Sequence, residues 1–338
     1  MSFDIERVDP MDLDLGTADA IAAADHASEE AAGLRLPPST GPAVLTALQL
    51  NSDCRPVDAL RVARDETGRA VGYVAVELPW RDNTDSAFLR GVVHPRARRH
   101  GLGSRLLGEA LSFVATTGRP KVYAGAYEGS DGVPALAAMG FAPLDTRYAI
   151  RRLDVHAAPH GAWQRFYDEA LPHAGDYDLV RQLGSTPEHR LASMVALHAA
   201  INDAPKDDPD MEEDVWDVDR VVSYEKAMAG RRQTLYRVMA VHRGTGDWAG
   251  QSLLCVDEFA PSVAFQEDTS VVRRHRGHRL GLLMKADMLR WLTDERPEIA
   301  AIDTWNATSN HHVIAVNERL GASVVGHHAG FRMLAASS

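Results

Sequence analysis

The feature that most constrains this chain is an internal repeat. The segment 67–72 (TGRAVG) returns as 245–250 (TGDWAG), at an offset of 178 positions. Single residues keep the same order at nearly the same offset: Val93 and Val271, Leu102 and Leu280, Gly140 and Gly321. Matches in one order at almost one offset predict two copies of one domain, and a length of 338 residues suits two cores of about 150 residues. We expect an N-terminal domain at 1–153, a connection at 154–176 and a C-terminal domain at 177–338.

Hydrophobic periodicity and turn residues predict the same elements in each copy. The expected fold is α/β in two tandem domains. The predicted elements, first copy before second, are an opening strand (3–8, 177–183), helices (clearest at 187–201), a strand (86–94, 265–272), a helix (102–117, 280–295), a strand (121–127, 299–305) and a final strand (145–153, 329–334).

Composition excludes several classes of protein. The chain has 36 Lys and Arg against 47 Asp and Glu, a formal net charge of −11, which argues against a nucleic-acid partner. Two cysteines build neither a disulfide framework nor a thiolate metal site, and the histidines lack an H-E-x-x-H motif, so no metal is expected. No signal-like N-terminus and no long apolar run predict a soluble cytoplasmic protein without membrane contact.

The most informative stretch joins the predicted strand at 86–94 to the predicted helix at 102–117. Glycines let the backbone approach an anion, arginines supply positive charge, and the first amides of a helix have no helical acceptor. Pyrophosphate fits this arrangement better than a single carboxylate. The residues expected to bind a phosphorylated cofactor are Val92, Val93, Arg98, Arg99, His100, Gly101, Leu102, Gly103 and Ser104.

The segment Arg98–Ser104 resembles the R/Q-x-x-G-x-G/A motif of the GCN5-related N-acetyltransferases, which grips the pyrophosphate of acyl-CoA. The resemblance covers 3–153 and 177–336, including the Gly140-Phe141 and Leu320-Gly321 endings. The tandem arrangement is similar to that of actinobacterial mycothiol synthase-like acetyltransferases. The resemblance implies acetyl-CoA as co-substrate and, in each copy, an α+β arrangement with a mixed, strongly twisted sheet that is splayed at its middle to admit the pantetheine arm.

The second copy departs from this motif, because Arg279 stands where the first copy has Gly101. Its side chain either obstructs the phosphate or folds outward and pairs with it. Asn306 and Asn310 follow the next strand, where family members commonly bond the pantetheine amides; the alternative is that Asn310 caps a helix. The second-copy residues expected at the cofactor are Val271, Val272, Arg276, Gly277, His278, Arg279, Gly281, Asn306 and Asn310.

Acetyl transfer to an amine needs a base for the amine and benefits from an acid for the departing thiolate. In the resembled family the base is often a glutamate on the strand before the phosphate loop, which makes Glu267 the candidate. It is expected on one face with Phe265, Thr269 and Val271; the alternative is a solvated edge carboxylate. The usual acid is a tyrosine, but those positions hold Leu136 and Asn317, so Tyr127 is a substitute that could equally pack in the core.

The segment 207–219 holds eight carboxylates in thirteen residues and would attract a cationic acceptor, or would simply be a solvated loop. The expected reaction is direct transfer of an acetyl group from acetyl-CoA to a primary amine of a small molecule or peptide. The alternative is a non-catalytic acyl-CoA-binding regulator. The chain is expected to be a monomer or a homodimer.

Overall fold

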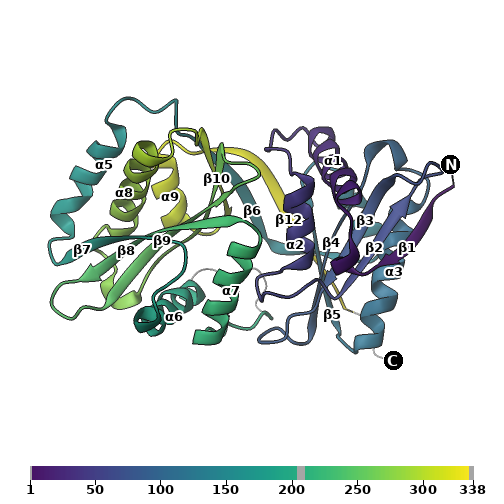
Figure 1. Ribbon diagram of the computed structural model, residues 1–338, viewed down its shortest axis with the longest axis horizontal. Helices are drawn as coiled ribbons and strands as arrows, with labels where there is room; N and C mark the ends of the chain where they lie inside the picture. The colour runs from purple at the N-terminus through teal and green to yellow at the C-terminus, as the bar shows by residue number, and fades with distance from the viewer. Residues whose placement is uncertain (1, 204–209, 335–338) are drawn as a thin grey trace. The chain divides into compact units, whose positions relative to one another are not determined.

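A computed structural model describes residues 2–203 and 210–334. The chain divides into two compact units (Figure 1). The first unit consists of residues 1–148, 207–212 and 326–338, and the second of residues 149–206 and 213–325. Among the described residues, no helix combines the length and the apolar character needed to cross a bilayer.

The first unit has a mixed sheet whose strands lie in the order β1-β2-β3-β4-β5, with the end of β12 beside β5. Helix α3 packs on this sheet through Leu102, Leu106, Ala110 and Val114, which recur every four residues on its buried face. The elements are β1 (Asp4–Val8), α1 (Leu15–Ala31), α2 (Gly41–Gln49), β2 (Ala59–Arg64), β3 (Ala70–Glu77), β4 (Ser86–Val93), α3 (Leu102–Thr117), β5 (Lys121–Tyr127) and α4 (Gly132–Ala138).

The second unit repeats this plan, with strands in the order β11-β10-β9-β8-β7 and the end of β6 beside β11. The predicted α/β fold with a mixed sheet in two copies is confirmed. The elements are α5 (Ala162–Ala170), β7 (Tyr177–Leu183), α6 (Leu191–Ala199), α7 (Val218–Gly230), β8 (Gln233–His242), β9 (Trp248–Asp257), β10 (Val263–Val271), α8 (Leu280–Glu295), β11 (Ala301–Ala307) and α9 (His311–Arg319).

The two units are not consecutive stretches of chain, because β6 (Ala142–Asp154) and β12 (Ser323–Leu334) are each divided between them. In the first unit the residues after 326 pair antiparallel with β5, from His328↔Tyr127 to Leu334↔Lys121. Residues 149–154 of β6 belong to the second unit. The boundaries expected at 153 and 177 would give two consecutive stretches of chain. In the structure, the end of β12 belongs to the first unit and the end of β6 to the second.

Segment 154–176, expected as a connection, contributes to the second core through α5. Trp163, Ala162 and Ala170 are buried in the same cluster as α8, and Arg290 of α8 lies over the ring of Tyr167, 4.3 Å from its centre. Helix α5 covers the outer side of α8, which explains why α8 is buried over most of its surface.

Each sheet opens at its middle. Strands β4 and β5 pair in parallel only from Ser86↔Lys121 to Phe88↔Tyr123, although both continue further. Strands β10 and β11 pair only from Val263↔Ala301 to Gln266↔Thr304. Beyond these points β4 no longer pairs with β5, and β10 no longer pairs with β11. The splayed sheet that the resemblance implied is therefore present in both units.

Candidate functional site

The first candidate anion site is the turn from β4 into α3. Gly101 precedes the helix with φ +76°, a left-handed conformation that favours glycine, and a Cβ added there would meet no atom within 4 Å. The first helical bond runs from the Arg105 amide to the Gly101 carbonyl, 3.1 Å, and no side chain caps the helix. The amides of Leu102, Gly103 and Ser104 therefore face outward as donors for an anion.

The arginines of this loop have two different roles. Arg98 braces the loop, because its guanidinium donates to the Val93 carbonyl (3.0 Å), to Ser28 Oγ (2.6 Å) and to Asp131 (3.1 Å). Arg96 and Arg99 are exposed and have no acidic partner among the residues that the structure describes. These two side chains are the free positive charges beside the helix amides.

The second loop repeats the geometry of the first. Arg276 Nε donates to the Val271 carbonyl at 3.0 Å, as Arg98 does to Val93, and its Nη2 meets Asp203 at 2.6 Å. The first bond of α8 runs from the Leu283 amide to the Arg279 carbonyl at 3.1 Å. The amides that begin α8 thus have the same arrangement as those of α3.

Arg279 adopts the left-handed conformation of its glycine counterpart, with φ +52°. Its Nη1 donates to Glu169 on α5 at 2.8 Å, and Arg319 also donates to Glu169. The side chain is therefore directed toward α5, where it pairs with Glu169. Phosphate binding by this loop stays a prediction.

The two asparagines of the second copy are both bonded within the protein. Asn310 caps α9 by accepting from the Val313 amide at 3.5 Å, as the capping alternative expected. Asn306 accepts from Asn317 Nδ2 at 2.8 Å. Asn317 stands at the position where the resembled family usually has a tyrosine acid. Its side chain binds Asn306 instead.

Glu267 lies at a β-bulge in β10. Gln266 pairs with Leu254 and Thr269 with Ser252, so β10 contains one extra residue between them. The Glu267 side chain is exposed at the surface. The protein around it still desolvates the carboxylate and raises its pKa to about 6, with Arg231 opposing the shift and Asp268 adding to it. A carboxylate with this pKa is suited to take a proton near neutral pH.

The face predicted for Glu267 is wrong in one respect, because the bulge interrupts the alternation along the strand. Val271 packs in the cluster beneath α8, and Thr269 Cγ2 lies 4.0 Å from the Cβ position of Gly281. Glu267 interacts instead with Tyr224 and Arg231 near α7. Thr269 and Val271 therefore face α8, whereas Glu267 faces α7.

A second acid, Asp268, follows in the same bulge and was missed by the sequence analysis. Its Oδ2 accepts from Ser270 Oγ (2.8 Å) and Gln251 Nε2 (3.0 Å), while its buried Oδ1 has no hydrogen-bond partner in the described part of the chain. Burial raises the pKa of Asp268. The only sequence signal was the one-residue insertion that makes the bulge.

The α6 side of this region is aromatic. His198 stacks on Trp216 with ring centres 4.0 Å apart, and burial lowers the pKa of His198 to about 3. His198 Nε2 and Trp216 Nε1 are both buried and have no hydrogen-bond partner among residues 2–203 and 210–334. A neutral imidazole and an indole N–H are thus unsatisfied on the same side of the sheet as Ser270, whose Oγ lies 3.4 Å from the Leu197 carbonyl of α6.

In the first unit Tyr127 is bonded to an acid. Its hydroxyl donates to Glu29 Oε1 of α1 at 3.3 Å, and burial raises the pKa of Glu29. Burial and the like charge of Glu29 raise the pKa of Asp25, one turn earlier, to about 7. The first unit therefore takes its titratable acids from α1, where we had not expected them, and not from β4.

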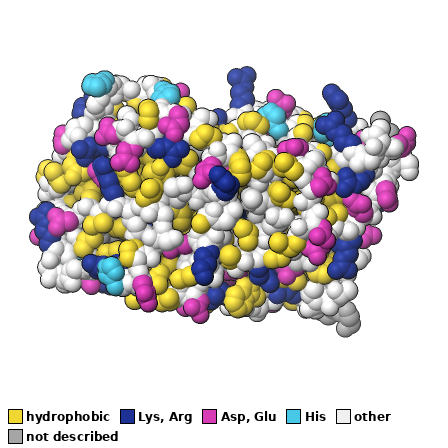
Figure 2. Space-filling view, viewed as in Figure 1, with side chains coloured by type: hydrophobic (Ala, Val, Ile, Leu, Met, Phe, Trp, Pro, Cys, Tyr) yellow, Lys and Arg dark blue, Asp and Glu magenta, His cyan; other side chains and the backbone are white. Residues whose placement is uncertain are grey.

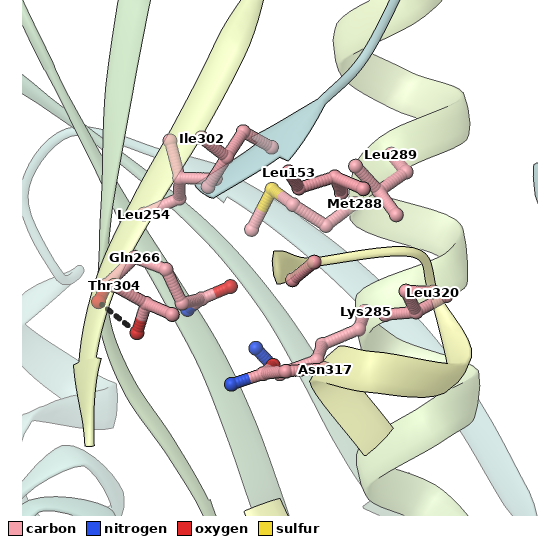
Figure 3. A pocket seen from close by; sticks show the side chains of 11 residues that line it. Leu153, Leu254, Gln266, Lys285, Met288, Leu289, Ile302, Thr304, Asn317 and Leu320 are labelled. Carbon is pink, nitrogen blue, oxygen red and sulfur yellow. Dashed lines mark hydrogen bonds between the residues drawn. The ribbon is translucent and has the colours of Figure 1, made fainter. Parts of the chain in front are cut away.

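The second unit contains a cavity of about 30 Å³ between β9–β11 and the helices α8 and α9. Figure 3 shows the side chains that line it. Lys285 of α8 is only 5% exposed, and burial lowers its pKa to about 7, with Asp268 opposing the shift. The cavity is lined by Leu153, Leu254, Gln266, Lys285, Met288, Leu289, Ile302, Thr304, Asn317, Leu320 and Ala322.

The acidic segment 207–219 is described from Asp210 onward; Asp207 and Asp208 lie outside the described residues. Asp210 binds Arg332 at 2.7 Å, and Glu212 accepts from the Asn83 amide at 2.6 Å. Asp217 caps α7 by accepting from the Arg220 amide. These three carboxylates therefore have structural partners within the protein, and attraction of a cationic acceptor by this segment stays a prediction.

Residues 2–203 and 210–334 contain no group of three or more His, Cys, Asp or Glu side chains placed to hold a metal ion. On the side of the molecule that Figure 2 shows, acidic, basic and apolar side chains are interspersed.

Comparison with known proteins gives the following matches. Residues 35–141 match the acetyltransferase (GNAT) family. A tandem GNAT protein from the clavulanic acid biosynthesis pathway, solved without AcCoA, is 25% identical over 100% of both chains, with a TM-score of 0.80. A GCN5-related N-acetyltransferase from Sphaerobacter thermophilus has a similar fold, with 18% identity over 98% of this chain and 95% of that one and a TM-score of 0.66. A search of curated proteins finds no significant match.

Proposed function

We propose, on the premise that this chain is a tandem member of the GCN5-related N-acetyltransferase superfamily, that it transfers an acetyl group from acetyl-CoA to a primary amine. Acyl transfer from acyl-CoA is the general activity that the fold supports. The observation that carries the proposal is repeated in both units: two parallel strands separate beside a helix whose first amides have no protein acceptor.

The first unit would bind acetyl-CoA at residues 92–104. The amides that begin α3 would receive the pyrophosphate, and Arg96 and Arg99 would neutralise its charge. The peptide groups of β4 beyond Phe88, which have no bond to β5, would pair with the amides of the pantetheine arm. The second unit offers the same elements at 271–281, with Arg279 turned toward Glu169.

Glu267 is the proposed base in the second unit. The neutral amine attacks the thioester carbonyl carbon, Glu267 accepts the amine proton directly or through water, and the carbon–sulfur bond breaks. Direct transfer is favoured over an acyl-enzyme because burial raises the pKa of the Cys255 thiol to about 12, which leaves it un-ionised at neutral pH. Tyr127, bonded to Glu29, is the corresponding polar group of the first unit.

The proposed acceptor is a small-molecule or peptide amine, including cationic amines, since the chain carries a net charge of −11. We propose further that the protein acts in the cytoplasm, as a monomer or a homodimer, without nucleic-acid or membrane partners. A second candidate function, regulation through acyl-CoA binding without catalysis, is favoured by Leu136 and Asn317 in place of the usual tyrosines.

The test is release of free CoA thiol from acetyl-CoA in the presence of a broad panel of primary amines. We expect release with at least one amine, and a fall in kcat/KM of about 10²-fold or more in Glu267→Gln. Glu188→Gln, an exposed carboxylate in the same unit, is the matched control and should keep the rate. Acetyl-CoA binding without thiol release for any amine would favour the regulatory function.

A further inference from the structure

The cavity of the second unit contains a charged side chain without a partner. Lys285 is 5% exposed and forms no hydrogen bond or ion pair with any described residue, and its side chain points into the cavity in Figure 3. The nearest opposite charge is Asp268 of β10, which is already bonded to Ser270 and Gln251. The neighbouring acids are also engaged: Asp303 of β11 by Arg152, Glu318 of α9 by Arg151, and Asp287 of α8 by Arg181.

The first unit shows that the fold does not require polar residues here. Ala87↔Val122 in the first sheet corresponds to Ala264↔Ile302 in the second, so Leu89 and Ala124 match Gln266 and Thr304. Lys285 and Leu107 are both the sixth residue of their helices, and Asn317 and Leu136 both stand four before the closing glycine. The four first-unit counterparts Leu89, Leu107, Ala124 and Leu136 all belong to one apolar cluster.

The polar residues of the cavity lie where the sheet opens. Gln266↔Thr304 is the last pair before β10 and β11 separate, and both residues line the cavity with Lys285. The candidate phosphate loop lies at the other end of the unpaired part of β10, five residues or roughly 15 Å away. An acyl-CoA with its phosphates at α8 would run back along this strand and bring its sulfur toward Gln266.

Adjacent residues of β10 then serve the two sides of the reaction. Gln266 faces the cavity and Lys285, whereas Glu267 faces α7. A thioester at the opening would have the proposed base on the acceptor side and an ammonium group on the sulfur side.

We propose that Lys285 is the proton donor to the departing CoA thiolate in the second unit. As the amine nitrogen bonds to the carbonyl carbon, the carbon–sulfur pair passes to sulfur and a proton moves from Lys285 Nζ to it, giving CoA thiol and neutral lysine. Glu267 holds the proton taken from the amine, and exchange through water returns both groups to their starting states. This inference rests on the proposed function.

Burial makes Lys285 suitable for this task. A lysine at its ordinary pKa gives up its proton reluctantly at neutral pH, whereas one lowered to about 7 transfers it readily and accepts another from water. Asn317, in the place of the usual tyrosine, has no ionisable proton to give. Acid–base sites typically contain an acid and a base whose surroundings shift both pKa values toward 7.

The test is an ultraviolet titration of the thiolate of bound CoA, in protein carrying Gly101→Glu so that only the second unit binds. An ammonium group within about 4–6 Å of the sulfur favours the thiolate, and the thiolate in turn keeps the lysine protonated, so the two groups titrate as a coupled pair. Bound CoA should therefore form thiolate at a lower pH than its usual thiol pKa of about 8–9 would give. Lys285→Leu should bind CoA and restore the ordinary thiol pKa. Lys226→Leu, which removes an exposed lysine of α7, is the matched control and should keep the lowered value.

Three outcomes would overturn the inference. If bound CoA has the same thiol pKa with and without Lys285, the lysine is not beside the sulfur, although acetyl-CoA binding and the proposed function stand. If the Gly101→Glu protein binds no CoA, the second unit is not the reaction site. If incubation with acetyl-CoA leaves an acetyl group on Lys285, seen by peptide mass spectrometry, the lysine is an acceptor and not the proton donor.

Discussion

Replacing Lys285 with leucine, the residue that the first unit has at the matching position, should stabilise the second unit at neutral pH. Lys285 is buried without a partner, and its pKa falls from 10.5 to about 7 on folding. A base with a lowered pKa opposes folding wherever it is charged in the unfolded chain. The cost is full below about pH 7, decreases as the pH rises, and vanishes above about pH 10.5.

The size of the effect follows from the shift. At 1.36 kcal/mol per pKa unit, the folded protein loses about 4 kcal/mol at pH 7 and about 2 kcal/mol at pH 9 through Lys285. Leucine removes this cost and adds buried apolar surface in a cavity lined by Leu254, Met288 and Leu289. The Lys285→Leu variant should thus be more stable but lack the proposed proton donor, as expected when a functional group is held in an unfavourable environment.

Urea unfolding followed by tryptophan fluorescence measures this change, because five of the six tryptophans, all except Trp80, lie in the second unit. The expected result is a higher free energy of unfolding for Lys285→Leu, with a gain about 2 kcal/mol larger at pH 7 than at pH 9. The matched variant Lys226→Leu should change neither value appreciably. A gain that is absent, or equal at the two pH values, would refute the assignment of Lys285 as a buried, unpaired lysine.

Two further predictions concern the carboxylates of the second unit. Glu225→Ala should lower the free energy of urea unfolding by about 3–5 kcal/mol, because it strands the fully buried Arg237, 3.0 Å away, whereas Glu258→Ala in an exposed pair should cost about 1 kcal/mol or less. Equal losses in the two variants would contradict this reasoning. The second prediction uses an amine identified by thiol release. With it, kcat/KM should fall as the pH drops through about 6, because protonated Glu267 cannot accept a proton. The pH profile of Glu267→Gln should not show this acid-side fall (the acid limb). If the limb persists in Glu267→Gln, another group is the base.

The sequence predicts the features that depend on local pattern. The repeated TG turns, the apolar face of α3 and the glycines of the 92–104 loop are each encoded within a few neighbouring residues. These local patterns predict the fold and the order of elements, which are the same in both units. The bonds from Arg98 to Val93 and from Arg276 to Val271 repeat the same loop geometry in the two units.

Features that depend on long-range pairing could not be predicted in this way. Strands β6 and β12 have the same apolar pattern whichever sheet they complete, so their exchange between units leaves no local signal. The acids of α1 reach Tyr127 only through tertiary structure.

The bulge in β10 did leave a signal. Ala87-Phe88 matches Ala264-Phe265 at an offset of 177, whereas Val93 matches Val271 at 178. The change of offset marks the single inserted residue, and with it the positions of Glu267 and Asp268. Lys285 was visible as the one lysine in the apolar run LGLLMKA, but its burial depends on α5 and α9, which pack around α8.

Calorimetric titration of the whole chain with acetyl-CoA counts how many of the two units bind the cofactor. We predict that two equivalents bind, because the helix amides are arranged alike in the two units and Arg279 is turned toward Glu169. Gly101→Glu should remove one equivalent and leave the other. An absence of binding, or the loss of all binding in Gly101→Glu, would contradict this prediction.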